Sequence, residues 1–116
     1  MQAIETAAVQ VALDKFSNRD IYIHLETTNG AYAAHRQEHF MAVCAYIRNG
    51  LVRYQRGSIA GIGPYRVGLK MNDGWIYAEG LTDWELDAEG RLLMAGHDTD
   101  GRLAIALELS AEPFPV

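Results

Sequence analysis

The sequence IYIHLETTNGAYAAH, residues 21–35, indicates the fold more clearly than any other part of the chain. Its first eight residues alternate between apolar and polar, as in a strand with one buried face. Asn29-Gly30 follows, and Asn-Gly is the strongest short signal for a tight hairpin, because both turn residues must accept a positive φ. We therefore expect an antiparallel hairpin whose inner face carries Ile21, Ile23 and Leu25.

This hairpin would bring metal-binding residue types to one face. A two-residue turn at 29–30 sets His24 opposite His35 and leaves Glu26 two residues along the same strand. Facing Cβ atoms lie about 5 Å apart, so both imidazoles could bind one divalent ion. Zinc takes such nitrogen and oxygen ligands and activates a bound water for hydrolysis. The candidate metal site is therefore His24, Glu26 and His35, and the alternative is an exposed polar strand face.

The same pattern of alternating runs and turn residues predicts three further hairpins. The second spans residues 40–56 and turns at Asn49-Gly50. The third spans residues 65–79 with Asp73-Gly74 as its loop, which would set Lys70 opposite Tyr77. The fourth turns near Gly90, between residues 84–86 and 92–95, and residues 103–109 form the last strand.

An N-terminal helix is expected over about residues 3–16, which are rich in alanine and lack glycine and proline. Its apolar residues at i, i+3, i+4 and i+7 form one stripe, namely Val9, Ala12, Leu13 and Phe16. We expect a single α+β domain over 1–116 that is mainly β, with about eight strands in an antiparallel meander over about 21–110. A strongly curved or barrel-like sheet would protect the strand edges.

Composition limits where the protein acts and what it binds. The net charge of −5 argues against nucleic acid as the main partner, because phosphate binding needs a dense basic surface. We find no apolar run of membrane-spanning length, and the first residues lack the basic and apolar regions of a secretion signal. The single cysteine, Cys44, fits a reducing compartment. We expect a cytoplasmic protein that binds neither nucleic acid nor membranes.

Charge is distributed unevenly along the chain. Residues 39–72 carry five basic residues and no acidic one, whereas residues 73–116 carry ten acidic residues and two basic ones. Arginine with tyrosine is typical of surfaces that bind carboxylates, phosphates or proteins. We interpret the basic middle as a surface for self-association, an acidic protein partner or a small anion, and its candidate residues are Tyr46, Arg48, Arg53 and Arg66. The alternative is that it only neutralises the acidic last third.

Two other polar segments have simpler explanations than a ligand site. His97–Gly101 contains Asp-x-Asp-Gly, but the other ligands of a calcium loop are missing, so an acidic turn explains it. Gly61–Arg66 lacks the third glycine and the lysine of nucleotide-binding loops, so its glycines indicate bulges or close backbone approach.

Long stretches of the chain resemble one family. Residues 21–33 (IYIHLETTNGAYA) resemble the central hairpin of the YojF-like family of small uncharacterised proteins of bacilli. Residues 63–70 (GPYRVGLK), 74–81 (GWIYAEGL) and 90–98 (GRLLMAGHD) resemble further segments of that family. The resemblance covers nearly the whole chain and implies a small intracellular protein with an accessory role.

The sequence holds no complete catalytic motif. The lack of a complete catalytic motif and the uneven distribution of charge along the chain favour a non-enzymatic binding or accessory protein that self-associates. The alternative is a metal-dependent hydrolase that uses His24, Glu26 and His35 and needs a divalent metal as cofactor. A small-anion binder that uses Arg48, Arg53 and Arg66 is the third hypothesis.

Overall fold

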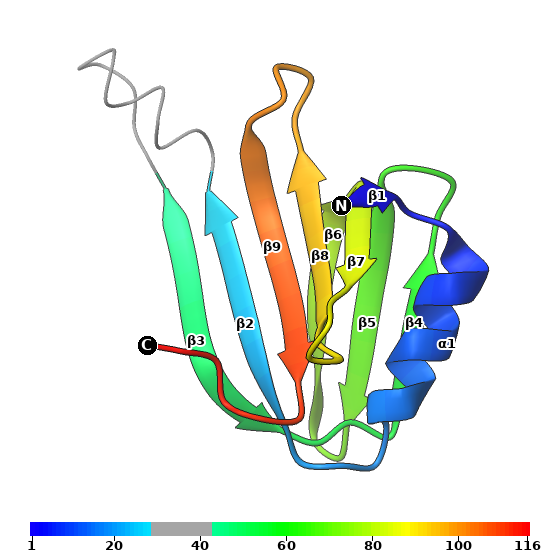
Figure 1. Ribbon diagram of the computed structural model, residues 1–116, viewed down its shortest axis with the longest axis vertical. Coiled ribbons are helices and arrows are strands. Elements are labelled where there is room, and N and C mark those ends of the chain that lie inside the picture. The colour runs from blue at the N-terminus through cyan, green and yellow to red at the C-terminus, as the bar shows by residue number, and fades with distance from the viewer. Residues whose placement is uncertain (29–42) are drawn as a thin grey trace.

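The computed structural model describes residues 1–28 and 43–116, which form one helix and two antiparallel sheets (Figure 1). The elements in chain order are β1 (Gln2–Ala3), α1 (Thr6–Phe16), β2 (Ile21–Thr28), β3 (Cys44–Val52), β4 (Arg56–Ala60), β5 (Tyr65–Met71), β6 (Gly74–Leu81), β7 (Asp83–Leu86), β8 (Leu92–His97) and β9 (Leu103–Ser110). The large sheet has the strand order β1-β7-β8-β9-β2-β3, and the small sheet has the order β4-β5-β6.

The helix forms where the alanine-rich segment predicts it. Glu5 caps the first turn by accepting hydrogen bonds from the backbone N–H groups of Ala7 and Ala8. The expected start at residue 3 is too early, because Gln2 and Ala3 pair with β7 instead. The predicted stripe is confirmed, since the buried residues of the helix are Val9, Ala12, Leu13 and Phe16. This helix of the described residues is not long and apolar enough to cross a membrane.

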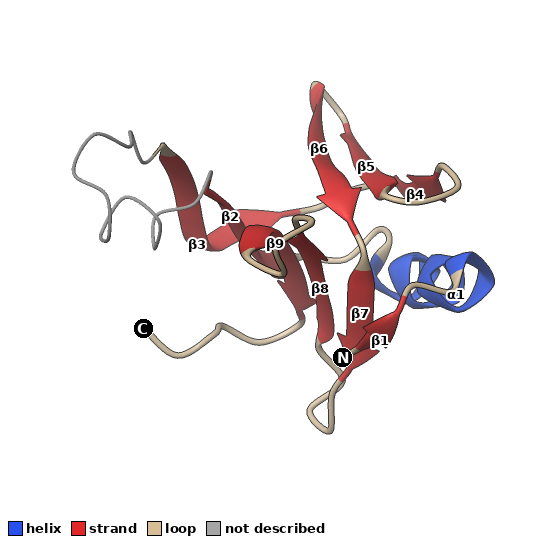
Figure 2. Ribbon diagram, turned by 90° about the horizontal axis from the view of Figure 1, so that it is seen from above, coloured by secondary structure: helices blue, strands red, loops and turns tan. Residues whose placement is uncertain are grey.

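α1 packs on the inner side of the small sheet and covers the edge of β4 (Figure 2). The side-chain amide of Gln10 donates to the carbonyl oxygen of Gly57 at 2.8 Å and accepts from the backbone N–H of Ile59 at 3.2 Å. Gln10 thus bonds the free backbone of β4 as a neighbouring strand would. Tyr54 is fully buried and donates its hydroxyl to the Leu13 carbonyl, which ties the helix to the connection between β3 and β4.

The pairing expected for the first hairpin is wrong. β2 lies between β3 and β9, so that His24 pairs with Arg48 on one side and Glu108 on the other. β3 and β9 occupy both sides of β2, so no side of β2 is left for a strand that would bring residue 35 opposite His24. The predicted inner face is confirmed, because Ile21 and Ile23 are buried in the core. His35 lies outside the described residues.

The second expected hairpin is also wrong, because Asn49-Gly50 lies within β3 instead of at its end. The register of β2 and β3 shifts between Ile23 and His24, which pair with Gly50 and Arg48, so Asn49 is the extra residue of a β-bulge. Asn49 has a φ of 59°, a left-handed conformation that asparagine tolerates better than most residues. The tolerance of a positive φ, which makes Asn-Gly a turn signal, allows a β-bulge at this position.

The remaining hairpins are confirmed, with one change of register. β5 and β6 pair around the loop 72–73, because Gly74 begins β6 instead of occupying the turn. Lys70 therefore faces Trp75, and Tyr77 faces Gly68. β7 and β8 pair around residues 87–91, and β9 forms the last strand as expected.

The described residues form two open sheets and no closed barrel. The meander is also only partial, since β4-β5-β6 and β7-β8-β9 are consecutive but β9 pairs with β2. The chain passes from the small sheet to the large sheet at Thr82. The backbones of Gly80 and Gly96 approach closely near this point, because a Cβ on Gly96 would lie 2.0 Å from the Gly80 carbonyl oxygen. The apolar core lies between the sheets and α1. A mainly β fold with one N-terminal helix is therefore confirmed.

Candidate functional site

The outer face of β2, β3 and β9 carries a polar cluster that the C-terminal residues cover, and we call it the tail-covered face. Its members are His24, Glu26, Tyr46, Arg48, Glu108 and Phe114. Strand alternation points His24 away from the core, yet this residue is only 6% exposed. The rings of Tyr46 and Phe114 lie with their centres 5.3 and 6.4 Å from the imidazole, and they exclude water from it.

Arg48 fastens the C-terminal tail to the sheet. Its Nε and Nη2 atoms donate to the carbonyl oxygen of Pro115 at 3.2 and 2.8 Å, and its Nη1 atom lies 3.7 Å from Glu108 Oε1. Its guanidinium also lies 4.8 Å from the centre of the Phe114 ring. The bulge residue Asn49 bonds the backbone N–H and C=O of Phe114 at 2.7 and 2.8 Å. Arg48 is therefore occupied in holding the end of its own chain.

Both ring nitrogens of His24 have partners. Arg48 Nη1 lies 3.3 Å from Nδ1, which must accept this bond because a guanidinium has no acceptor. Nε2 then carries the proton and donates to Glu26 Oε1 at 3.3 Å. In the part of the chain that the structure describes, no group of three His, Cys, Asp or Glu residues could hold a metal ion. The site of His24, Glu26 and His35 stays a prediction, because His35 lies outside that part.

The outer face of the small sheet carries a second cluster, which we call the open face. The register of β4, β5 and β6 places nine residues there in three rows across the strands: Ala60, Arg66 and Glu79; Ser58, Gly68 and Tyr77; Arg56, Lys70 and Trp75. The helix lies on the opposite side of this sheet (Figure 2). Trp75 and Tyr77 are 44% and 52% exposed, respectively.

The two aromatic rings organise the open face. Trp75 and Tyr77 stack with their centres 5.3 Å apart and their planes 9° apart. They lean over Gly68, where a Cβ would lie 2.9 Å from the Tyr77 ring. The Arg66 guanidinium lies 5.3 Å from the centre of Tyr77, and Lys70 Nζ lies 5.3 Å from the centre of the Trp75 ring. These cation–π contacts favour positions of both cations over the rings.

The charges of the open face are unequally paired. Arg66 forms an ion pair with Glu79 across β5 and β6. Arg56 and Lys70 face each other on β4 and β5, and like charges on facing residues destabilise a sheet. Within residues 1–28 and 43–116, neither Arg56 nor Lys70 forms an ion pair.

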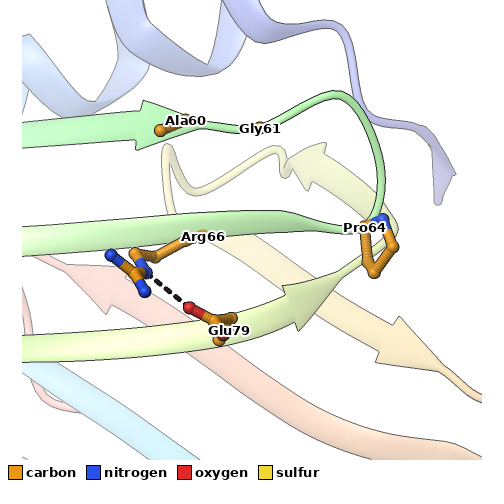
Figure 3. Close-up of a pocket in the computed structure, with 5 residues that line it drawn as sticks. All are labelled: Ala60, Gly61, Pro64, Arg66 and Glu79. Carbon is orange, nitrogen blue, oxygen red and sulfur yellow. Dashed lines mark hydrogen bonds and ion pairs between the residues drawn. The ribbon is translucent and has the colours of Figure 1, made fainter.

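A hollow of 320 Å³ lies at the Arg66 end of the open face. Its lining residues are Ala60, Gly61, Pro64, Arg66 and Glu79. Figure 3 shows Arg66 and Glu79 pointing toward each other from neighbouring strands. Because its two charged residues pair with each other, this hollow offers no uncompensated charge to a ligand.

The structure separates the residues that the sequence grouped as one anion or partner surface. Tyr46 and Arg48 lie on the tail-covered face, and Arg66 lies on the open face. Arg53 lies on neither, and its Nε is 3.4 Å from the exposed carboxylate of Asp20. The described part of the basic segment, residues 43–72, runs from the large sheet to the small sheet, so nearness in sequence is not nearness in space. The prediction also missed Arg56 and Trp75, which the pairing of β4 with β5 and the correct register of β5 and β6 would have added.

Two acidic turns at the ends of β8 share one construction. Asp87 and Asp98 each accept hydrogen bonds from the backbone N–H groups two and four residues later, which confirms 97–101 as part of a turn. Arg91 additionally donates from Nε to Asp87 Oδ2 at 2.6 Å. Burial alone would raise the pKa of Asp87, but the hydrogen bonds from Arg91 outweigh it and hold the pKa below its usual range.

A histidine–carboxylate pair links β7 and β8. His97 Nδ1 lies 2.9 Å from Asp83 Oδ2, and Thr82 Oγ1 donates to the same oxygen at 2.7 Å. The hydrogen bond from Thr82, followed by that from His97, lowers the pKa of Asp83. Because Thr82 donates its hydroxyl to Asp83 and not to His97, the three residues do not form a nucleophile–base relay. No spacing in the sequence indicates this pair, since its members lie on different strands.

The fold and these surfaces define a small antiparallel two-sheet protein with exposed faces. Residues 3–114 match the family described as "Protein of unknown function (DUF1806)", and the chain belongs to this family. It is 56% identical to the "Uncharacterized protein YojF" of Bacillus subtilis (strain 168) over 116 residues, which is all of both chains. The crystal structure of the Bacillus subtilis YojF protein matches with a TM-score of 0.84 and 51% identity, over 99% of this chain and 97% of that chain. The family resemblance expected from the sequence is confirmed.

Proposed function

We propose that this protein is a non-enzymatic, cytoplasmic binding protein that acts as a dimer, in which two copies pair their β3 strands edge to edge. The observation that carries the proposal is the edge of β3, which no described strand covers. This strand has nine residues and ends the large sheet, with no further strand beside it among the described residues. A cytoplasmic location is supported by the single exposed thiol of Cys44, which a reducing compartment keeps free.

The other sheet edges of the described chain are shorter or lie against other elements. β1 has only two residues, β4 is bonded by Gln10 of α1, and β6 packs against β8 and β9. A long edge strand presents unpaired backbone groups that readily pair with another strand. β3 carries one charged residue, Arg48, which the tail already occupies, and the bulge at Asn49 is its one irregularity. β3 is therefore the edge best suited to pair with a second chain.

The side chains of β3 suit a second copy of the same strand. Tyr46 and Leu51 on the outer face and Ile47 on the inner face are 60%, 62% and 47% exposed. A two-fold axis at Ile47 would set Tyr46 opposite Arg48 of the second copy and would bring no like charges together. Such a self-complementary patch is what a symmetric dimer requires. β3 lies at the opposite end of the molecule from α1 (Figure 1), so pairing leaves the small sheet accessible.

Sedimentation equilibrium tests this proposal directly. The wild-type protein should be dimeric, and Ile47→Lys and Leu51→Lys should each shift it to the monomer by placing an ammonium group in an apolar interface. Val11→Lys is the matched control, because Val11 is 57% exposed on α1, far from β3, and this variant should remain dimeric. A wild-type protein that is monomeric at about 100 μM, well above the dissociation constants of specific complexes, would refute the dimer.

A further inference from the structure

We propose that the open face binds a carboxylate-rich segment of a partner protein, with Arg56, Lys70 and Trp75 at the centre of the site. The proposal is independent of the dimer, because the open face and β3 share no residue and lie on different sheets. This second proposal names the class of partner, an acidic protein segment, and the surface that binds it, the open face.

The first argument is the uncompensated charge. Arg56 and Lys70 face each other across β4 and β5 and form no ion pair among the described residues, and Glu79 is already paired with Arg66. This excess of positive charge stands on a chain whose net charge is −5. A carboxylate placed between Arg56 and Lys70 would remove their repulsion and form charge-assisted hydrogen bonds with both. The face is therefore complementary to an acidic ligand.

The second argument is that the site is already ordered. Lys70 lies over Trp75 and Arg66 lies over Tyr77, so two long flexible side chains are held in place without a ligand. Gly68 makes this possible, because any side chain there would collide with the Tyr77 ring. Groups that are ordered in advance lose less conformational entropy when they bind.

The third argument concerns the kind of ligand. Small molecules are usually held in concave clefts that cover most of their surface, whereas Trp75 and Tyr77 stand half-exposed on a sheet face. Tryptophan, tyrosine and arginine are the residues that dominate protein–protein binding energy. The three rows of the open face span about 13 Å along the strands, which suits an extended segment of about four residues. A protein segment thus fits this face better than a small anion.

The stacked rings also favour carboxylates over nucleic-acid bases. Single-stranded nucleic acids bind to proteins by stacking bases on exposed aromatic faces. Here Trp75 and Tyr77 stack on each other, and Lys70 and Arg66 lie over them. The rings therefore present mainly their edges, and the cations are the groups left to bind a ligand.

A nuclear magnetic resonance titration with a short poly-L-glutamate peptide at low salt tests the site. The peptide should shift the indole N–H resonance of Trp75 and leave that of Trp84, which is nearly buried, in place. Arg56→Gln combined with Lys70→Gln should weaken binding at least tenfold. The matched control, Arg53→Gln combined with Lys15→Gln, removes the same charge from exposed positions outside the open face and should bind as the wild type does.

Several results would overturn the proposal. They are an unshifted Trp75 resonance, equal weakening in the control pair, or tighter binding of a thymidine oligonucleotide or inorganic phosphate at the same residues. The single variant Arg56→Gln keeps the contact between Lys70 and Trp75, so it should stay folded and still lose affinity. Ile47→Lys should bind the peptide normally whether or not it dimerises, which separates failure of this site from failure of the dimer.

Discussion

The two outer faces of this molecule draw their arginines from one basic segment and use them in opposite ways. On the tail-covered face, Arg48 contacts Pro115, Glu108 and His24, and its charge is fully engaged within the chain. On the open face, Arg56 and Lys70 face each other and form no ion pair in the described chain. A run of basic residues therefore does not show which cations are available to a ligand, since that depends on what lies across the strand and above it.

The C-terminal tail makes the difference between the two faces. Phe114 is buried against the large sheet, and its backbone is bonded by Asn49. It covers His24 and lies close to both Arg48 and Arg91. On the small sheet, the corresponding outer side has no such cover among the described residues (Figure 2). Removing the tail contact should make the first face resemble the second.

The largest effect is expected from Phe114→Ala. Removing this buried ring should lower the free energy of unfolding by about 3 kcal/mol, the lower end for loss of a buried phenylalanine, because the residue lies near the chain end. Thermal unfolding should show a melting temperature lower by at least about 10 °C. Val116→Ala, at the fully exposed end of the tail, should change nothing. Equal stability of the two variants would show that the tail does not hold this face.

Arg48→Ala should destabilise the protein by about 2 kcal/mol, because it removes the ion-pair partner of the Glu108 carboxylate and the donor to His24 Nδ1 in a partly buried place. Arg53→Ala is the matched change, because Arg53 pairs with an exposed aspartate. This variant should lower the free energy of unfolding by about 0.5 kcal/mol or less. Urea unfolding of both variants measures the difference. Similar losses would mean that Arg48 is no more engaged than an ordinary surface arginine.

Asp87 should make stability depend on pH. Its pKa is lower in the folded protein, so the ionised carboxylate stabilises the fold above the unfolded pKa of about 4, and this stabilisation is lost as pH falls through the folded-state value. Asp87→Asn should therefore lose less stability than the wild type between pH 5 and pH 2 in urea titrations. Arg91→Gln should flatten the profile in the same direction, because it removes the side-chain donor to Asp87. If both variants lost stability with falling pH as steeply as the wild type, Asp87 would not be the source of the pH dependence.

Much of the fold could be predicted from local pattern. The stripe of α1, the alternation of β9 and the hairpins around residues 72–73 and 87–91 follow from periodicity and turn residues, which act over short distances. The resemblance to the YojF-like family was also visible in the sequence, and the family match over residues 3–114 confirms it.

The pairings that failed depend on distant segments. Asn49 can accept the same positive φ in a turn or in a bulge, and the bulge depends on partners far along the chain, namely β2 and the Phe114 backbone 65 residues later. The neighbours of His24 are likewise set by β3 and β9, so its partners could not be derived from the adjacent turn. The open face was predicted in part, but the row of Arg56, Lys70 and Trp75 required the exact registers of β4, β5 and β6, and a shift of the β5–β6 loop by one residue changes the partner of Lys70.

The most direct test of the contrast between the two faces is Arg56→Glu, measured for both stability and binding of poly-L-glutamate. Replacing one of two facing cations by an acid should raise the free energy of unfolding by about 0.5 kcal/mol and abolish binding, because the new carboxylate takes the place proposed for the ligand. A variant that is less stable than the wild type and binds the peptide equally well would contradict the account.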